Sequence, residues 1–180
     1  MRRPLLLAAS RCLLPLVALT IAACGETPED AKFAPACPAL SLLQDADNIT
    51  RFSGSGHDIT EMQVAARITA VPAKCMRADA KHVRAVLSVD ADVLRGPAAG
   101  RDAFDVRYFV AVTEGGNVLQ EQDFALAARF RPNVDQVSVK GEDIELLLPV
   151  TRKKSAAAYH VYIGFRLTPD QLAYNRAQQH

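Results

Sequence analysis

The chain has 180 residues and a formal net charge of +1 at pH 7, with 21 basic against 20 acidic side chains. A chain this close to neutral lacks the concentrated positive charge of a nucleic-acid binder, so we expect no nucleic-acid partner. Its length suits one folded domain and is short for two. The hydrophobic share of 49% is large enough to form a packed core.

The first 23 residues have the three parts of an export signal. A basic segment with three arginines is followed by the apolar residues 12–21, and two alanines then precede Cys24. The apolar stretch is about half of the roughly 20 residues that a transmembrane helix needs. The sequence therefore predicts a signal peptide over residues 1–23 that is removed by cleavage.

The residues around the cleavage site indicate a lipoprotein. An ordinary secretory site needs a small residue where Ile21 stands. The stretch Ile21-Ala22-Ala23-Cys24 instead resembles the bacterial lipobox. The resemblance implies diacylglycerol on the Cys24 sulfur, cleavage before Cys24, and acylation of the new amine, for example by palmitate. Several acyl chains hold a protein stably on a membrane, whereas one chain is marginal.

The residue after the lipidated cysteine bears on location. It is Gly25, and the absence of aspartate there resembles the sorting pattern of outer-membrane lipoproteins. We therefore expect a protein of the cell envelope, lipid-anchored in the outer membrane with its domain in the periplasm. Residues 24–36 are interpreted as the lipidated N-terminus and a flexible tether, and residues 37–180 as the domain. The alternative is a soluble secreted protein with an incidental cysteine.

Two cysteines remain in the domain, Cys37 and Cys75. An even pair in the oxidising periplasm predicts a disulfide. Zinc binding is the rival interpretation, but the two cysteines are far apart and no histidine stands at ligand spacing. We expect no metal and no cofactor.

Apolar residues alternate with polar ones through most of the domain, which is typical of antiparallel sheets with one face on the core. Turn residues separate the runs, and Gly115-Gly116 is a good hairpin signal. About seven strands predict an all-β fold, an antiparallel β-sandwich of immunoglobulin- or fibronectin-like architecture. The likeness is architectural only, because the chain has no tryptophan and Cys37 precedes the strands. Six alternating runs lie at residues 62–70, 83–89, 106–112, 124–130, 144–148 and 159–167.

The C-terminal residues change to a helical pattern. Thr168-Pro169-Asp170-Gln171 is a capping box with proline at the first helical position. The sequence thus predicts a short C-terminal helix, and we expect it to pack on the sandwich through Leu172.

Two stretches resemble a known family. The tail Leu167–Arg176 (LTPDQLAYNR) and the stretch Tyr108–Thr113 (YFVAVT) look like those of a family of small proteobacterial envelope lipoproteins. The resemblance covers most of the predicted domain. It implies an envelope location and brings no activity with it.

No group of residues predicts catalysis. The Ser53–Gly56 stretch matches neither G-x-S-x-G nor a phosphate-binding loop, so a turn is favoured. His57 and Asp58 are neighbours that would point to opposite faces of an extended chain. His82 and His160 fall on polar sides of their strands and could meet only if those strands pair. The sequence therefore favours a protein that is not an enzyme.

Apolar residues on polar strand faces suggest an interaction surface. Phe109 and Tyr162 face away from the core, as do Val86 and Leu147. We hypothesise that Phe109 and Tyr162 lie on adjacent strands at the centre of a partner-binding surface, bordered by Arg107 and His160. The alternative is that the C-terminal helix or the segment after Cys37 covers them.

Two classes of function follow from these observations. The first is a non-enzymatic envelope interaction or structural module, anchored to the membrane by its lipid and binding an envelope protein. The second is a periplasmic ligand-binding protein or hydrolase with a site assembled from scattered loops. A deep pocket with a serine or carboxylate beside one histidine would favour the second class.

Overall fold

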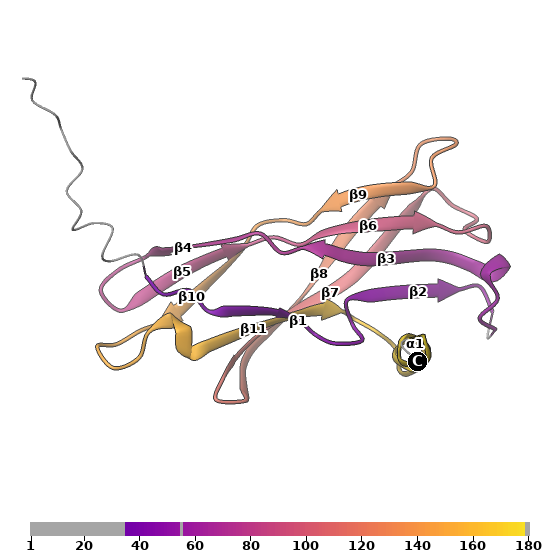
Figure 1. The fold of residues 1–180 in the computed structure, drawn as a ribbon. Helices are drawn as coiled ribbons and strands as arrows, with labels where there is room; N and C mark the ends of the chain where they lie inside the picture. The colour runs from indigo at the N-terminus through magenta and orange to yellow at the C-terminus, as the bar shows by residue number, and fades with distance from the viewer. Residues whose placement is uncertain (1–34, 55, 179–180) are drawn as a thin grey trace, which may run out of the picture. The chain divides into compact units, whose positions relative to one another are not determined.

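The computed structural model describes residues 35–54 and 56–178, which are mostly β-strand with one short α-helix (Figure 1). The expected signal peptide, Cys24 and nearly all of the tether lie outside these described residues. No helix in the described ranges is long and apolar enough to cross a membrane. The elements are β1 (Ala39–Leu42), β2 (Asn48–Phe52), η2 (Ile59–Glu61), β3 (Met62–Ala70), β4 (Ala73–Arg77), β5 (His82–Leu87), β6 (Asp90–Arg95), β7 (Ala103–Glu114), β8 (Asn117–Arg129), β9 (Gln136–Lys140), β10 (Ile144–Pro149), η3 (Ala156–Ala158), β11 (Tyr159–Phe165) and α1 (Pro169–Ala177).

The strands form three sheets. The first has the order β1-β11-β7-β8, the second β2-β3-β6-β9, and the third β10-β5-β4. The described pairings are antiparallel except that of β1 with β11, which is parallel. The expectation of antiparallel pairing is therefore wrong for β1 and β11. Alternation of apolar residues shows which face of a strand is buried, but it does not show whether neighbouring strands run in the same direction.

The second and third sheets are joined through the backbone. The Ser88 N–H donates to the Pro72 carbonyl at 3.1 Å, and the Gly141 N–H donates to the Val89 carbonyl at 2.8 Å. Strands β3 and β4 are separated at Pro72, which cannot donate to a ladder. The described chain has eleven strands where about seven were predicted, because β1, β2, β4, β6 and β9 lie outside the runs that the alternation identified.

One hydrophobic core receives side chains from all three sheets. Most inward residues of the predicted alternation are buried, but Ala70 is exposed and Phe124 and Leu167 are only half-buried. The largest fully buried side chains include Tyr108, Phe104 and Phe165. Burial, assisted by the nearby Glu142 carboxylate, raises the pKa of Tyr108 to about 12. The phenol therefore stays protonated in the core at physiological pH.

A disulfide joins Cys37 to Cys75, with their Cα atoms 5.8 Å apart. The predicted pairing is thus present. It ties the segment before β1 to strand β4 of the third sheet, across a sequence separation of 38.

Helix α1 begins as the capping box predicts. The Gln171 N–H donates to the Thr168 hydroxyl at 3.3 Å, and the Thr168 N–H donates to Gln171 Oε1 at 2.9 Å. Asn175 of this helix is only 2% exposed. Its side-chain amide donates to the carbonyls of Asp45 (2.7 Å) and Asn48 (2.8 Å), which places α1 beside β2. Leu172, the expected contact, is only partly buried.

Candidate functional site

The outward face of the first sheet brings the hypothesised surface residues together. Phe109 lies on β7 and Tyr162 on the neighbouring strand β11. In the register of this pair, Phe109 is opposite Gly164 and Tyr162 is opposite Ala111. The two aromatic residues are therefore diagonal neighbours on one face, a spacing within reach of large side chains.

Phe109 is fixed in place by its surroundings. The Arg166 guanidinium lies 4.6 Å from the centre of the phenyl ring, in cation–π geometry. Arg166 is in turn held by carboxylates of β8, at 2.6 Å from Glu121 and also by Asp123. Hydrogen bonds to Asp123 and Glu121 raise the pKa of Arg166. The absence of a side chain at Gly164 leaves room for the ring, since a Cβ there would be 3.3 Å from it.

Tyr162 is ordered in a similar way. The His160 imidazole stacks on the Tyr162 ring with 4.3 Å between ring centres and an angle of 7°. His160 Nε2 lies 2.8 Å from the Ser41 hydroxyl on β1, so the edge strand helps to orient the stack. Stacked rings of this kind stabilise each other beyond the area that they bury.

The surface differs from the hypothesis in its border. Arg107 is exposed on the same strand as Phe109, but the guanidinium on the Phe109 ring belongs to Arg166. Val86 and Leu147 belong to the third sheet, so they are not part of this patch. Among the described elements, the main contact of α1 is with β2, and both aromatic residues keep part of their surface exposed.

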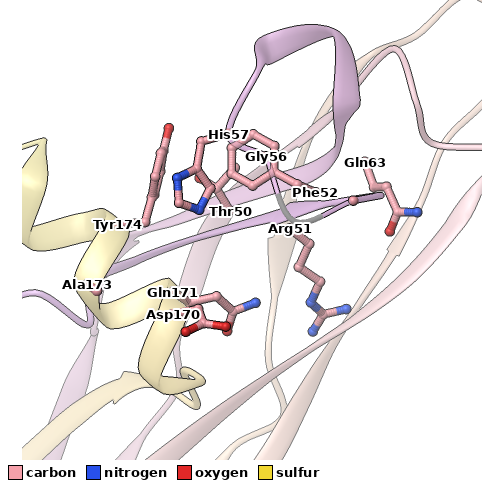
Figure 2. A pocket seen from close by; sticks show the side chains of 11 residues that line it. Thr50, Arg51, Phe52, Gly56, His57, Gln63, Asp170, Gln171, Ala173 and Tyr174 are labelled. Atoms are coloured by element: carbon pink, nitrogen blue, oxygen red, sulfur yellow. The ribbon is translucent and has the colours of Figure 1, made fainter.

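A second feature is an open cleft of about 590 Å³ between β2, the loop after it, and α1 (Figure 2). On one side, the rings of Phe52, His57 and Tyr174 contact one another with centres 4.8–5.2 Å apart. On the other side lie Arg51 and the first turn of α1 with Asp170 and Gln171 (Figure 2). The cleft thus combines an aromatic wall with charged and amide groups.

Arg51 is the partly buried cation of the cleft. One guanidinium nitrogen donates to the Asp105 carbonyl at 3.2 Å. Desolvation, together with the nearby Arg101, lowers the pKa of Arg51, and an arginine nevertheless remains charged at neutral pH. Sequence reasoning missed this cleft, because its walls come from residues about 120 positions apart in the chain.

The histidines do not assemble into a catalytic group. Asp58 accepts hydrogen bonds from the N–H and the hydroxyl of Thr60, which lowers the pKa of Asp58, and it caps η2 without contacting His57. His82 contacts Asp79 at 2.9 Å in the third sheet, whereas His160 lies in the first. Within residues 35–54 and 56–178, no cluster of three or more His, Cys, Asp or Glu side chains could hold a metal ion.

Comparisons with protein-family models, with curated proteins and with solved structures found no match for this chain. Its function therefore has to be inferred from the surfaces and cavities that the fold creates, since a fold alone does not define a function.

Proposed function

We propose that the chain is a lipid-anchored bacterial envelope protein whose β domain is a non-enzymatic interaction module. The lipobox-like Ile21–Cys24 stretch and the likeness to small proteobacterial envelope lipoproteins support the anchor. The Cys37–Cys75 disulfide supports an oxidising compartment such as the periplasm. In this proposal the signal peptide is removed before Cys24 and the domain is tethered to the outer membrane.

The same proposal gives the domain the architecture of a β-sandwich. The first sheet would form one layer and the joined second and third sheets the other, with the shared core between them. The likeness to immunoglobulin and fibronectin domains extends to this layering alone. Such layers leave their outward faces free to carry an interaction surface.

The observation that carries the interaction role is the ordered pair Phe109 and Tyr162. Each ring is already held by a neighbouring side chain, Arg166 or His160, before any partner binds. Side chains fixed in advance lose little conformational entropy on association. Aromatic and arginine residues are the common anchors of protein interfaces. The expected partner is an envelope protein that offers an apolar centre with a charged rim.

Cross-linking in living cells tests this surface. Tyr162 is replaced by the photoreactive p-benzoylphenylalanine, which keeps an aromatic ring against His160. The matched control carries the same residue at Leu147, which is 52% exposed on the third sheet. We expect irradiation to yield a discrete cross-linked species from position 162 and none from position 147. Equal products at both positions, or none at 162, would contradict the proposed surface.

The cleft supports a second candidate, a periplasmic ligand-binding protein. The wall of Phe52, His57 and Tyr174 facing Arg51 suits a small molecule with an aromatic or apolar part and an anionic group. If the protein acts only by binding a ligand in the cleft, the outward face of the first sheet binds no partner. The absence of a cross-link at position 162 would therefore favour this candidate.

A further inference from the structure

The end of the domain that carries Pro35 and Ala36 has an unusual concentration of basic residues. These two residues line a cavity of about 390 Å³ together with Arg77, His82 and Arg152. The cavity lies between the β4–β5 turn and the β10–β11 loop, which meet through a hydrogen bond from the Val150 N–H to the Lys81 carbonyl at 2.7 Å. Figure 1 shows both loops at the same end of the domain.

Four basic side chains at this end are exposed and form no ion pair with another described residue: Arg77 at the end of β4, and Lys81, Arg152 and Lys153 in the two loops. Nearby carboxylates are already engaged. Asp79 accepts a hydrogen bond from the Lys81 N–H and contacts the His82 ring, and both interactions lower the pKa of Asp79. Glu114 is paired with Lys154 at 3.1 Å. The end of the domain therefore presents net positive charge.

Exposed apolar residues lie on the β7–β8 hairpin, which is joined to the β10–β11 loop by the ion pair of Glu114 with Lys154. The turn of this hairpin and the loop also line one cavity, through Gly115 and Ala157. Just after the turn, Val118 and Leu119 are 61% and 56% exposed. A basic group beside exposed aliphatic residues is the composition of a membrane-surface contact, where phosphates meet the charges and aliphatic groups enter the interface.

We propose that this end of the domain docks on an anionic phospholipid bilayer. Arg77, Lys81, Arg152 and Lys153 would contact lipid phosphates, and Val118 and Leu119 would enter the interfacial region. The orientation rests on the proposed lipid at Cys24. Only the segment 25–34 separates that cysteine from Pro35, and fully extended it reaches about 35 Å. The chain enters the described domain at Pro35, so this end is the first part of the domain along the chain from the proposed lipid.

The sequence contains no tryptophan, so a single introduced indole reports on this contact. The Leu119→Trp protein is purified in its mature form and placed on vesicles of phosphatidylethanolamine and phosphatidylglycerol, and on vesicles of phosphatidylcholine alone. We expect a blue-shifted emission and quenching by brominated lipid on the anionic vesicles, both reversed by high salt. The control Val134→Trp, in the β8–β9 loop, should show neither change.

Charge reversal identifies the residues responsible. Each basic residue near an anionic surface contributes about five-fold to binding, so Arg152→Glu with Lys153→Glu should abolish the Leu119→Trp signal. The same reversal at Arg129 and Arg131, also exposed, should leave the signal intact. Circular dichroism confirms that each variant is folded.

Several outcomes separate this inference from the proposed function. If the mature protein carries no lipid, the proposed anchor is wrong. The docking surface then still predicts that the emission of the tryptophan at position 119 depends on phosphatidylglycerol when that protein is added to vesicles. If the protein is lipidated and emission at position 119 is the same on neutral and anionic vesicles, the docking surface is wrong. Sedimentation with isolated peptidoglycan and no change on vesicles would also overturn it.

Discussion

Replacing Gly96 with alanine should lower the free energy of unfolding by about 3 kcal/mol, the upper range of steric overpacking. A Cβ atom at this buried position would lie 2.1 Å from the Met62 carbonyl oxygen and 2.6 Å from its carbonyl carbon. Both are backbone atoms that cannot rotate away. The Gly96 N–H donates to the Gln63 carbonyl at 2.9 Å, and the Ala98 N–H donates to the Met62 carbonyl at 3.0 Å. The two segments are therefore held together by the contacts that the methyl group would break.

Urea unfolding followed by circular dichroism measures this effect. The matched control is Gly54→Ala, whose new Cβ would meet only the flexible Glu61 carboxylate, at 3.4 Å. A surface change of this kind stays within about 0.5 kcal/mol of the parent. If the Gly96→Ala variant and the parent have equal urea unfolding midpoints, β3 moves aside at little cost in free energy. That result would contradict the account of a tight contact between Gly96 and the Met62 backbone.

Loss of the Cys37–Cys75 disulfide should have an effect of similar size. The bond closes a sequence separation of 38, and loop-closure entropy then gives a stabilisation of about 4 kcal/mol. We expect the variant with both cysteines of the pair changed to serine to unfold at much lower urea than the parent. Dithiothreitol should bring the parent to the level of this variant.

The serine variant serves as its own control for the reductant. Its unfolding midpoint should be the same with and without dithiothreitol, because no other pair of cysteines exists in the domain. If the urea unfolding midpoint of the parent protein is the same with and without dithiothreitol, the link to the N-terminal segment adds nothing to the stability of β4 and its sheet.

Local features of the fold were predictable from the sequence. Period-two alternation identified the inward residues, because opposite faces of a strand take alternate side chains. The capping box located the start of α1 to the residue, since its hydrogen bonds are local. Gly115 and Gly116 marked the β7–β8 hairpin, where both adopt positive φ values of 56° and 85°.

Features that join distant segments were not predictable. The parallel pairing of β1 with β11 has no signature in alternation. Asn175 stands in a polar tail, and nothing in its neighbours shows that its amide bonds to the carbonyls of Asp45 and Asn48. The Arg166 contact with Phe109 likewise depends on the register of β7 and β11 and on the carboxylates of β8. A single sequence shows which face of a strand is buried and where turns form. Strand order depends on packing across the whole domain, so it has no such local signal.

Mass spectrometry of the N-terminal peptide from the natively expressed protein tests the central claim of a lipid-anchored envelope module. We expect the mature chain to begin at Cys24, with diacylglycerol on its sulfur and an acyl chain on its amine. The Cys24→Ala variant should accumulate as an unprocessed or mislocalised precursor. A mature N-terminus without lipid, or a Cys24→Ala protein that is processed normally and stays membrane-bound, would contradict the account.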